Sequence, residues 1–184
     1  GGQLYKSDDD GLNWTEVFSK QVVARSIVAA PSEPLLVYAG GLSIYRSNDG
    51  GDNWTQVNAG LPDSQVWNIA IHPTQSLTVY ATTSAGVFKT MDGGDTWSSW
   101  GISLPANGLR ELRISRRDPS IQYATSDCSG VYVSLDEGRH WQSMIFGLGN
   151  LCVNDIALDL SSLRLYAATE GGIWQLDLTN GAQQ

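Results

Sequence analysis

The sequence predicts an all-β protein built from repeated antiparallel units of four strands. The motif Ser/Thr-x-Asp-x-Gly-x-x-Trp occurs four times, starting at Ser7, Ser47, Thr90 and Ser134. The successive starts are 40, 43 and 44 residues apart, and four short strand-like runs fit each interval. No segment has the pattern of an amphipathic helix of three turns. A period of this length with four strands per unit is typical of a β-propeller blade.

The first run of each unit alternates apolar and polar residues and is interpreted as the inner strand. In three of its four copies the run stops at a proline, which cannot donate a hydrogen bond to a neighbouring strand. The copies lie at 24–31, 66–73, 109–119 and 153–160.

The second and third runs are rich in the β-branched and aromatic residues that favour strands. The second run is found at 35–40, 77–83, 121–126 and 163–169. The third includes GLSIYRS, AGVFKT, SGVYVS and GGIWQL, with an earlier copy, GQLYKS. The fourth run begins at the motif tryptophan, at 14–18, 54–58, 97–102 and 141–146.

The repeated motif is interpreted as the turn between the third and fourth strands. Its glycine provides a backbone conformation that other residues resist, and its Asp and Ser/Thr side chains can bond the loop amides. The tryptophan is expected to bury its ring beside the hairpin. The residues concerned are Ser7, Asp9, Gly11 and Trp14; Ser47, Asp49, Gly51 and Trp54; Thr90, Asp92, Gly94 and Trp97; and Ser134, Asp136, Gly138 and Trp141.

These four motifs resemble the Asp-box, or bacterial neuraminidase repeat. The whole chain is similar to the Asp-box β-propellers of sialidases, sortilin-type receptors, xyloglucanases and photosystem II assembly factors. The resemblance implies that each box lies at the periphery of the face away from the usual ligand site. The box residues are therefore expected to be structural, and function is sought on the opposite face. The shared architecture does not specify a shared chemistry.

The repeats divide the chain into one propeller domain or segment spanning 1–184. A partial blade at 1–18 precedes blades at 19–58, 59–102 and 103–146, and a partial blade at 147–184 follows. Seventeen strands are expected, which is not a multiple of four. The favoured interpretation is a segment of a larger ring, and the alternative is self-association through unpaired blade edges.

Composition excludes several classes of partner. The 184 residues carry a formal net charge of −8, with acidic residues spread along the chain, so nucleic acid is not an expected partner. No stretch approaches the length of a membrane span, and no signal segment opens the chain. Neither cofactor nor metal is expected, since Cys128 and Cys152 fit no metal-binding spacing and only two histidines, His72 and His140, occur. Both histidines are expected on the side opposite the ligand face.

The two cysteines are either one disulfide or two buried thiols. In the predicted blades, Cys128 lies in a loop between second and third strands, and Cys152 lies before the next inner strand. Both loops belong to the ligand face of neighbouring blades. A disulfide is therefore predicted, which implies an oxidising, extracytoplasmic compartment.

The ends of the inner strands on the ligand face supply the candidate binding residues Arg25, Trp67, Arg110 and Asn154. The next positions are Ser26, Asn68, Glu111 and Asp155. An aromatic ring near guanidinium and amide groups resembles a sugar or carboxylate site. The alternative interpretation is that these side chains line the central channel and pair with one another.

Enzymatic activity has weaker support in the sequence. The Arg-Ile-Pro signature of sialidases is absent. Glu111, Asp155 and Glu170 are the only carboxylates that can be placed near the ligand face as a glycosidase pair. The sequence therefore favours a non-catalytic binding or scaffolding module for a protein or carbohydrate. The alternative is a fragment of a glycoside hydrolase or sialidase-like enzyme whose catalytic residues remain unknown.

Overall fold

The computed structural model describes residues 3–18, 23–103, 108–145, 147–159 and 164–178. The described residues form strands and turns and include no helix, which confirms the predicted all-β class. The chain divides into two compact units, residues 1–99 and 100–184, which are described separately. That residues 1–184 form one propeller domain stays a prediction.

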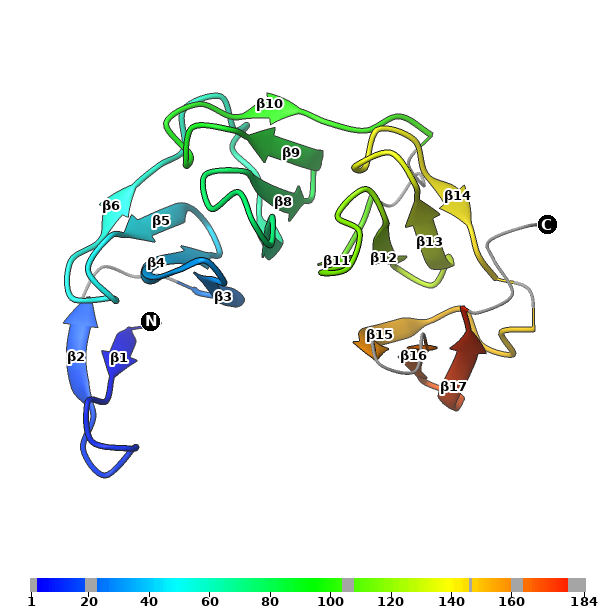
Figure 1. Ribbon diagram of the computed structural model, residues 1–184, viewed down its shortest axis with the longest axis horizontal. Coiled ribbons are helices and arrows are strands. Elements are labelled where there is room, and N and C mark those ends of the chain that lie inside the picture. Colours follow the sequence, from blue (N-terminus) through cyan, green and yellow to red (C-terminus); the bar gives the residue numbers. More distant parts are fainter. Residues whose placement is uncertain (1–2, 19–22, 104–107, 146, 160–163, 179–184) are drawn as a thin grey trace. The chain divides into compact units, whose positions relative to one another are not determined.

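The first unit contains a hairpin and two four-stranded sheets (Figure 1). The hairpin pairs β1 (Leu4–Lys6) with β2 (Thr15–Phe18). One sheet has the order β3 (Ser26–Ala30), β4 (Glu33–Gly40), β5 (Ile44–Ser47) and β6 (Thr55–Gln56). The other has the order β7 (Val66–Ile71), β8 (Val79–Thr83), β9 (Gly86–Thr90) and β10 (Ser98–Ser99). All pairs are antiparallel and consecutive in sequence.

The second unit contains one four-stranded and one three-stranded sheet. The former has the order β11 (Glu111–Ile114), β12 (Gln122–Ser126), β13 (Gly130–Ser134) and β14 (Gln142–Ser143). The latter has the order β15 (Val153–Asp159), β16 (Arg164–Thr169) and β17 (Gly172–Asp177). Within the described residues β17 is an edge strand, so self-association through blade edges stays a prediction.

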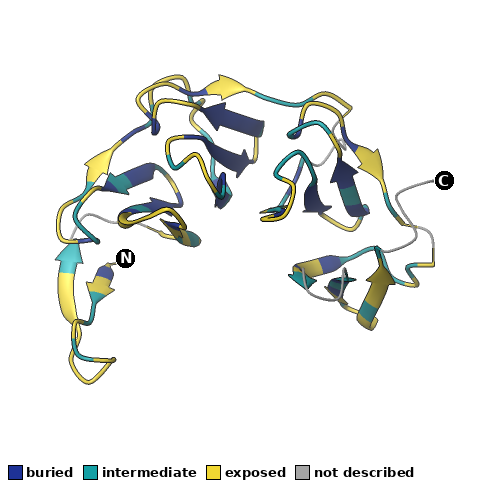
Figure 2. Cartoon of the chain, viewed as in Figure 1, coloured by how far each residue is buried: buried dark blue, intermediate teal, exposed yellow. Residues whose placement is uncertain are grey.

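The fourth strands are shorter than predicted. In each complete sheet only two residues form the outer ladder, and the strand begins one residue after the motif tryptophan. These residues are exposed (Figure 2) because an outer strand has a partner on one side only. The outer strand therefore contributes less to the core than the three strands before it.

The core of the first unit lies between its two four-stranded sheets. Tyr38 and Ile44 from the first sheet and Val79 and Ala81 from the second are fully buried in one apolar cluster. Burial of a large apolar side chain contributes roughly 1.5–3 kcal/mol. In the second unit, a separate cluster joins Val131 and Val133 to Ile156 and Leu165 across two neighbouring sheets.

The four Asp-boxes share one hydrogen-bonded turn. In the second box, Ser47 Oγ donates to Asp49 Oδ1 at 2.7 Å and accepts the Gly51 N–H at 2.8 Å. Asp49 Oδ1 also accepts the Asn53 N–H at 2.9 Å. Gly51 has φ +98°, a conformation that side chains with a Cβ resist. Hydrogen bonds from the backbone and side chain of Asn53, then from Ser47, lower the pKa of Asp49 to about 2.

The same turn recurs in the other three boxes. The hydroxyl of the first residue bonds both the Asp carboxylate and the glycine N–H, in the triplets Ser7, Asp9 and Gly11; Thr90, Asp92 and Gly94; and Ser134, Asp136 and Gly138. Each box thus satisfies loop amides with its own side chains, and no ligand is needed to explain its residues.

Two boxes also form an ion pair with the preceding repeat, a role that was not predicted from sequence. Lys6 Nζ lies 2.7 Å from Asp52 Oδ1, and Arg46 NH1 lies 3.0 Å from Asp95 Oδ1. Each cation belongs to a third strand, and each carboxylate belongs to the next box. The signal was present in the sequence as a basic residue one position before Ser7 and Ser47.

The expected burial of the motif tryptophans is wrong for Trp14, which is 63% exposed. Trp97 and Trp141 are each 4% exposed, and Trp54 is intermediate. The Trp97 indole N–H donates to Val57 O at 2.9 Å, which belongs to the preceding sheet. The described residues contain no sheet before β1 and β2, so no preceding sheet packs over Trp14.

We expect Thr90→Val to lower the free energy of unfolding by about 1–2 kcal/mol. Thr90 is 2% exposed, and its hydroxyl donates to Asp92 and accepts the Gly94 N–H. Valine keeps the shape but leaves this amide without its acceptor. Urea unfolding measures the effect, and Thr55→Val on the exposed β6 is the control. Equal stability of the two variants would contradict a structural role for the box hydroxyl.

Candidate functional site

The predicted binding residues lie at or beside the beginnings of the inner strands β3, β7, β11 and β15, which we call the strand mouths. The register places one mouth residue of each strand opposite one of the last two residues of the second strand of the same sheet: Ser26 opposite Gly40, Asn68 opposite Thr82, Glu111 opposite Thr125, and Asp155 opposite Ala168. These four positions, matched to one another in the sequence repeats, thus have similar places in their sheets.

In the first unit the structure brings together Arg25 and Trp67. The Arg25 guanidinium carbon lies 4.8 Å from the centroid of the Trp67 ring, which is a cation–π distance. The β7–β8 register shifts between Val66 and Asn68, so Trp67 occupies a β-bulge. Bulges redirect side chains and are enriched beside functional sites. The bulge thus accounts for how Trp67 leaves the regular alternation of β7.

Neighbouring mouths are joined by hydrogen bonds at equivalent positions in both units. Ser26 Oγ accepts the Ile69 N–H at 3.1 Å, and Glu111 Oε2 accepts the Ile156 N–H at 3.2 Å. In each case the acceptor begins one inner strand and the amide belongs to the next. These contacts fix adjacent blades to one another beside the candidate binding residues.

In the second unit Arg110 lies beside the disulfide-linked loops. Its NH2 group lies 2.8 Å from Asp127 Oδ2. Cys128, the next residue, is joined to Cys152, with the two Cα atoms 3.7 Å apart. The bond connects the β12–β13 loop to the segment before β15. The predicted disulfide is present in the structure, and the Cα separation is shorter than the usual range.

A compact ionic cluster occupies the mouths of β11 and β15. Arg113 NH2 bonds the Glu111 carboxyl and lies 3.4 Å from Asp155 Oδ1. The Glu111 side chain is 14% exposed. Burial and then a hydrogen bond with the Asp155 carboxyl raise the pKa of Glu111 to about 7, although Arg113 and the Ile156 amide oppose this shift.

The Glu111 and Asp155 carboxyls share Arg113 NH2 as an ion-pair partner. A glycosidase pair has both carboxyls facing the scissile bond, about 5–5.5 Å apart in a retaining enzyme and about 6.5–9.5 Å apart in an inverting one. Glu111 instead accepts a backbone amide from the neighbouring blade, which is a structural contact.

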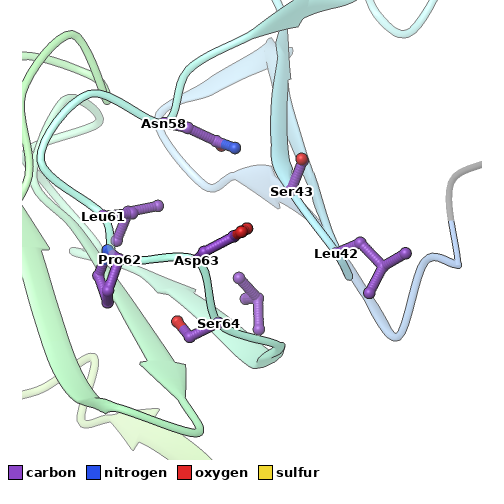
Figure 3. Close-up of a pocket in the computed structure, with 8 residues that line it drawn as sticks. Leu42, Ser43, Asn58, Leu61, Pro62, Asp63 and Ser64 are labelled. Carbon is purple, nitrogen blue, oxygen red and sulfur yellow. The ribbon is translucent and has the colours of Figure 1, made fainter.

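The first unit also contains a pocket of about 230 Å³ that the sequence analysis did not find (Figure 3). It lies between the β4–β5 loop and the 58–66 segment that leads into β7. The lining residues are Leu42, Ser43, Asn58, Leu61, Pro62, Asp63, Ser64 and Val66. In the sequence this segment is the polar, proline-containing stretch NAGLPDSQ before an inner strand.

The remaining candidates lie in separate places. Asn154 is exposed at a register shift in β15, and Glu170 is exposed in the β16–β17 turn. His72 Nδ1 accepts hydrogen bonds from the N–H groups of Thr74 and Gln75, while His140 pairs with Asp136 in the fourth box.

No group of three His, Cys, Asp or Glu residues in the described parts of the chain could hold a metal ion. No helix among those same residues is long and apolar enough to cross a membrane.

Comparison with models of known protein families shows which family the chain belongs to. The model of the family described as sortilin, neurotensin receptor 3, matches residues 42–156. The chain belongs to the sortilin-Vps10 family. The matched residues of this sortilin-Vps10 chain include three of its Asp-boxes, the pocket, Trp67, Arg110 and both cysteines. The resemblance to Asp-box propellers is thereby confirmed.

Solved structures similar to this sortilin-Vps10 chain share its fold. An ancestral GH74 enzyme is 19% identical with a TM-score of 0.74, covering 97% of this chain and 28% of the enzyme. The GH74 enzyme of Niastella koreensis is 17% identical with a TM-score of 0.76, covering 97% of this chain and 33% of the enzyme. YCF48 bound to D1 peptide is 15% identical with a TM-score of 0.63, covering 86% of this chain and 52% of YCF48. A comparison with curated proteins gave no match.

These likenesses show the fold alone. The sortilin-Vps10 chain spans 28% and 33% of the lengths of the two GH74 enzymes. Their identities are too low to transfer an activity or a set of site residues.

For the sortilin-Vps10 chain we expect replacement of both cysteines by serine to lower the free energy of unfolding by about 3 kcal/mol. The bond closes a loop with a sequence separation of 24 residues. Urea unfolding of the double variant measures the loss, and reduction of the unmodified protein should reproduce it. Mass spectrometry after alkylation of the unreduced, denatured protein provides the direct check. Two alkylated thiols there would show that no disulfide forms.

A second expectation concerns the pH dependence of stability. Because folding raises the pKa of Glu111 from 4.5 to about 7, protonated Glu111 stabilises the fold. This contribution is complete below pH ~4.5 and is lost as the pH rises through 7, by at most roughly 3 kcal/mol. Glu111→Gln should therefore be less sensitive to pH between 4.5 and 7.5 in urea unfolding. Glu170→Gln, which changes an exposed carboxyl in the same unit, is the control. If both variants keep the full pH dependence, the Glu111 cluster is not its source.

Proposed function

We propose that this chain is a non-catalytic, extracytoplasmic binding or scaffolding module that engages a protein or glycan through the loops of one propeller face. The observation that carries the proposal is the surface of the first unit that bears the Arg25–Trp67 stack. Trp67 directly follows Val66, a residue that lines the 230 Å³ pocket.

The surface has features of a recognition site. Tryptophan and arginine are the residues most enriched at binding hot spots, because both combine a large contact area with polar groups. Trp67 lies at a bulge within β7, and Arg25, the residue before β3, donates its backbone N–H to Gly40 O at 2.7 Å. Such preorganisation reduces the entropy lost on binding.

A binding role is better supported than a catalytic one. At the mouths of the second unit, Glu111 and Asp155 both pair with Arg113, and Glu111 also accepts a backbone N–H. A glycoside hydrolase fragment is the alternative, supported by the fold that the chain shares with GH74 enzymes.

The class of partner and the compartment follow from separate arguments. The solved structure of YCF48 contains a bound D1 peptide, so a propeller of this fold can bind a protein segment. Aromatic rings beside guanidinium groups also suit sugars, which supports glycans as a second class of ligand. The Cys128–Cys152 bond favours an oxidising environment outside the cytoplasm.

The test is binding of the labelled 184-residue chain to a random peptide array and a glycan array. We expect a reproducible set of ligands on at least one array. Trp67→Ala and Arg25→Ala should each weaken the selected ligands roughly tenfold, as removal of a hot-spot residue does. Fluorescence polarisation with the selected peptides or glycans measures the change.

Trp14→Ala is the matched control because Trp14 is an exposed tryptophan in an Asp-box of the same unit. Binding that is unchanged by Trp67→Ala and Arg25→Ala would contradict the proposed surface. Absence of ligands on both arrays would contradict the binding role. Turnover of fluorogenic glycosides by the purified chain would favour the enzymatic alternative.

A further inference from the structure

We propose that the pocket between the β4–β5 loop and the 58–66 segment is a subsite for one lysine or arginine side chain of a protein partner. The inference rests on the proposed binding function and specifies what this part of the surface recognises. It is carried by the size of the pocket, the arrangement of its apolar and polar groups, and its charge.

The pocket is sized for one side chain rather than for a whole small molecule. Its volume of about 230 Å³ is below the range of roughly 300–1,000 Å³ found for drug-sized ligands. Leu42, Leu61, Pro62 and Val66 form its apolar wall. A hydrocarbon stem can lie along such a wall while its polar end remains in a hydrated region.

The polar groups of the pocket suit a cationic end group. Figure 3 shows the Asp63 carboxylate and the Asn58 amide pointing into the space opposite Ser43. Asp63 has no hydrogen-bond or ion-pair partner among the described residues, so its charge is available. The Ser64 hydroxyl also lacks a hydrogen-bond partner there. Ammonium and guanidinium groups donate several hydrogen bonds and accept none, which matches the Asp63 carboxylate, whereas Asn58 Oδ1 already accepts the Ile44 N–H at 2.8 Å.

The loop carrying Asp63 is held in place by backbone contacts. The Leu61 N–H donates to Asn58 O at 2.9 Å, and the Val66 N–H donates to Gly41 O at 2.8 Å. Gly60 has φ +88°, and a Cβ there would lie 2.2 Å from Trp97 O. Only glycine fits this close approach. The carboxylate is therefore presented by a segment fixed at both ends.

Other ligand classes fit the pocket less well. No lysine, arginine or histidine lines it, so it lacks a partner for a carboxylate or phosphate. No aromatic side chain lines it, so it lacks the flat surface on which a sugar ring stacks. The formal net charge of −8 also attracts a basic protein segment over long range.

The pocket is tested by NMR titration of the full chain with three small probes. The probes are lysine, arginine and norleucine, each acetylated on its α-amino group and blocked as the N-methylamide, so that the side chain is unmodified. We expect the lysine or arginine probe to shift the amide signals of Ser43, Asp63 and Ser64, and the uncharged norleucine probe to leave them unchanged. Asp63→Asn should raise the dissociation constant roughly fivefold, and added salt should act in the same direction.

Asp10→Asn is the matched control, because it removes one exposed carboxylate of the same unit and asparagine tolerates the φ of 57° at that position. An equal effect of the two variants would reduce the interaction to overall charge and overturn the subsite. Equal shifts with norleucine would likewise overturn the role of the carboxylate. If array ligands depend on Trp67 but these probes do not bind, the subsite fails while the proposed binding function stands. If the probes bind but no array ligand depends on Trp67, the subsite stands while the proposed binding surface fails.

Discussion

Each four-stranded sheet of this chain has apolar side chains on its faces. These side chains become buried only when a second sheet packs against them. In the first unit this contact joins Tyr38 and Ile44 to Val79 and Ala81, and in the second it joins Val131 to Ile156. Packing between consecutive sheets is the source of the core, because a single sheet cannot cover itself. The positions of the loops and strand mouths follow from this stacking.

The Asp-box makes the stacking regular at the outer edge. Its Ser or Thr hydroxyl, Asp carboxylate and glycine amide close the turn without outside partners, so the turn has the same shape in every repeat. Ionic contacts such as Arg46–Asp95 then tie one repeat to the next. Because these groups are already paired with one another, the acidic appearance of the boxes does not indicate a ligand site.

The strand mouths differ from the boxes in that their side chains vary among repeats. Ser26 and Glu111 occupy the same structural position and accept the same kind of inter-blade hydrogen bond. Glu111 additionally engages Arg113 and Asp155, whereas the first unit has the Arg25–Trp67 stack and a pocket nearby. Repetition therefore provides a common frame, while the side chains at the mouths differ from repeat to repeat. One architecture can host unrelated functions because function depends on such local side chains.

The sequence by itself determined the all-β class, the order of the strands and the position of each box between third and fourth strands. These features depend on local patterns: alternation of apolar residues, glycine in the turn, and a period near that of a blade. It also allowed the Cys128–Cys152 pairing to be inferred from blade topology, since the two loops belong to one face of adjacent blades. Only the tertiary structure decided that Arg25 stacks on Trp67, that Trp14 is exposed, and that Asp63 faces a pocket. Those outcomes depend on a bulge, on the presence of a covering sheet and on the approach of two loops. Each depends on whether residues distant in sequence come into contact, which a local pattern does not encode.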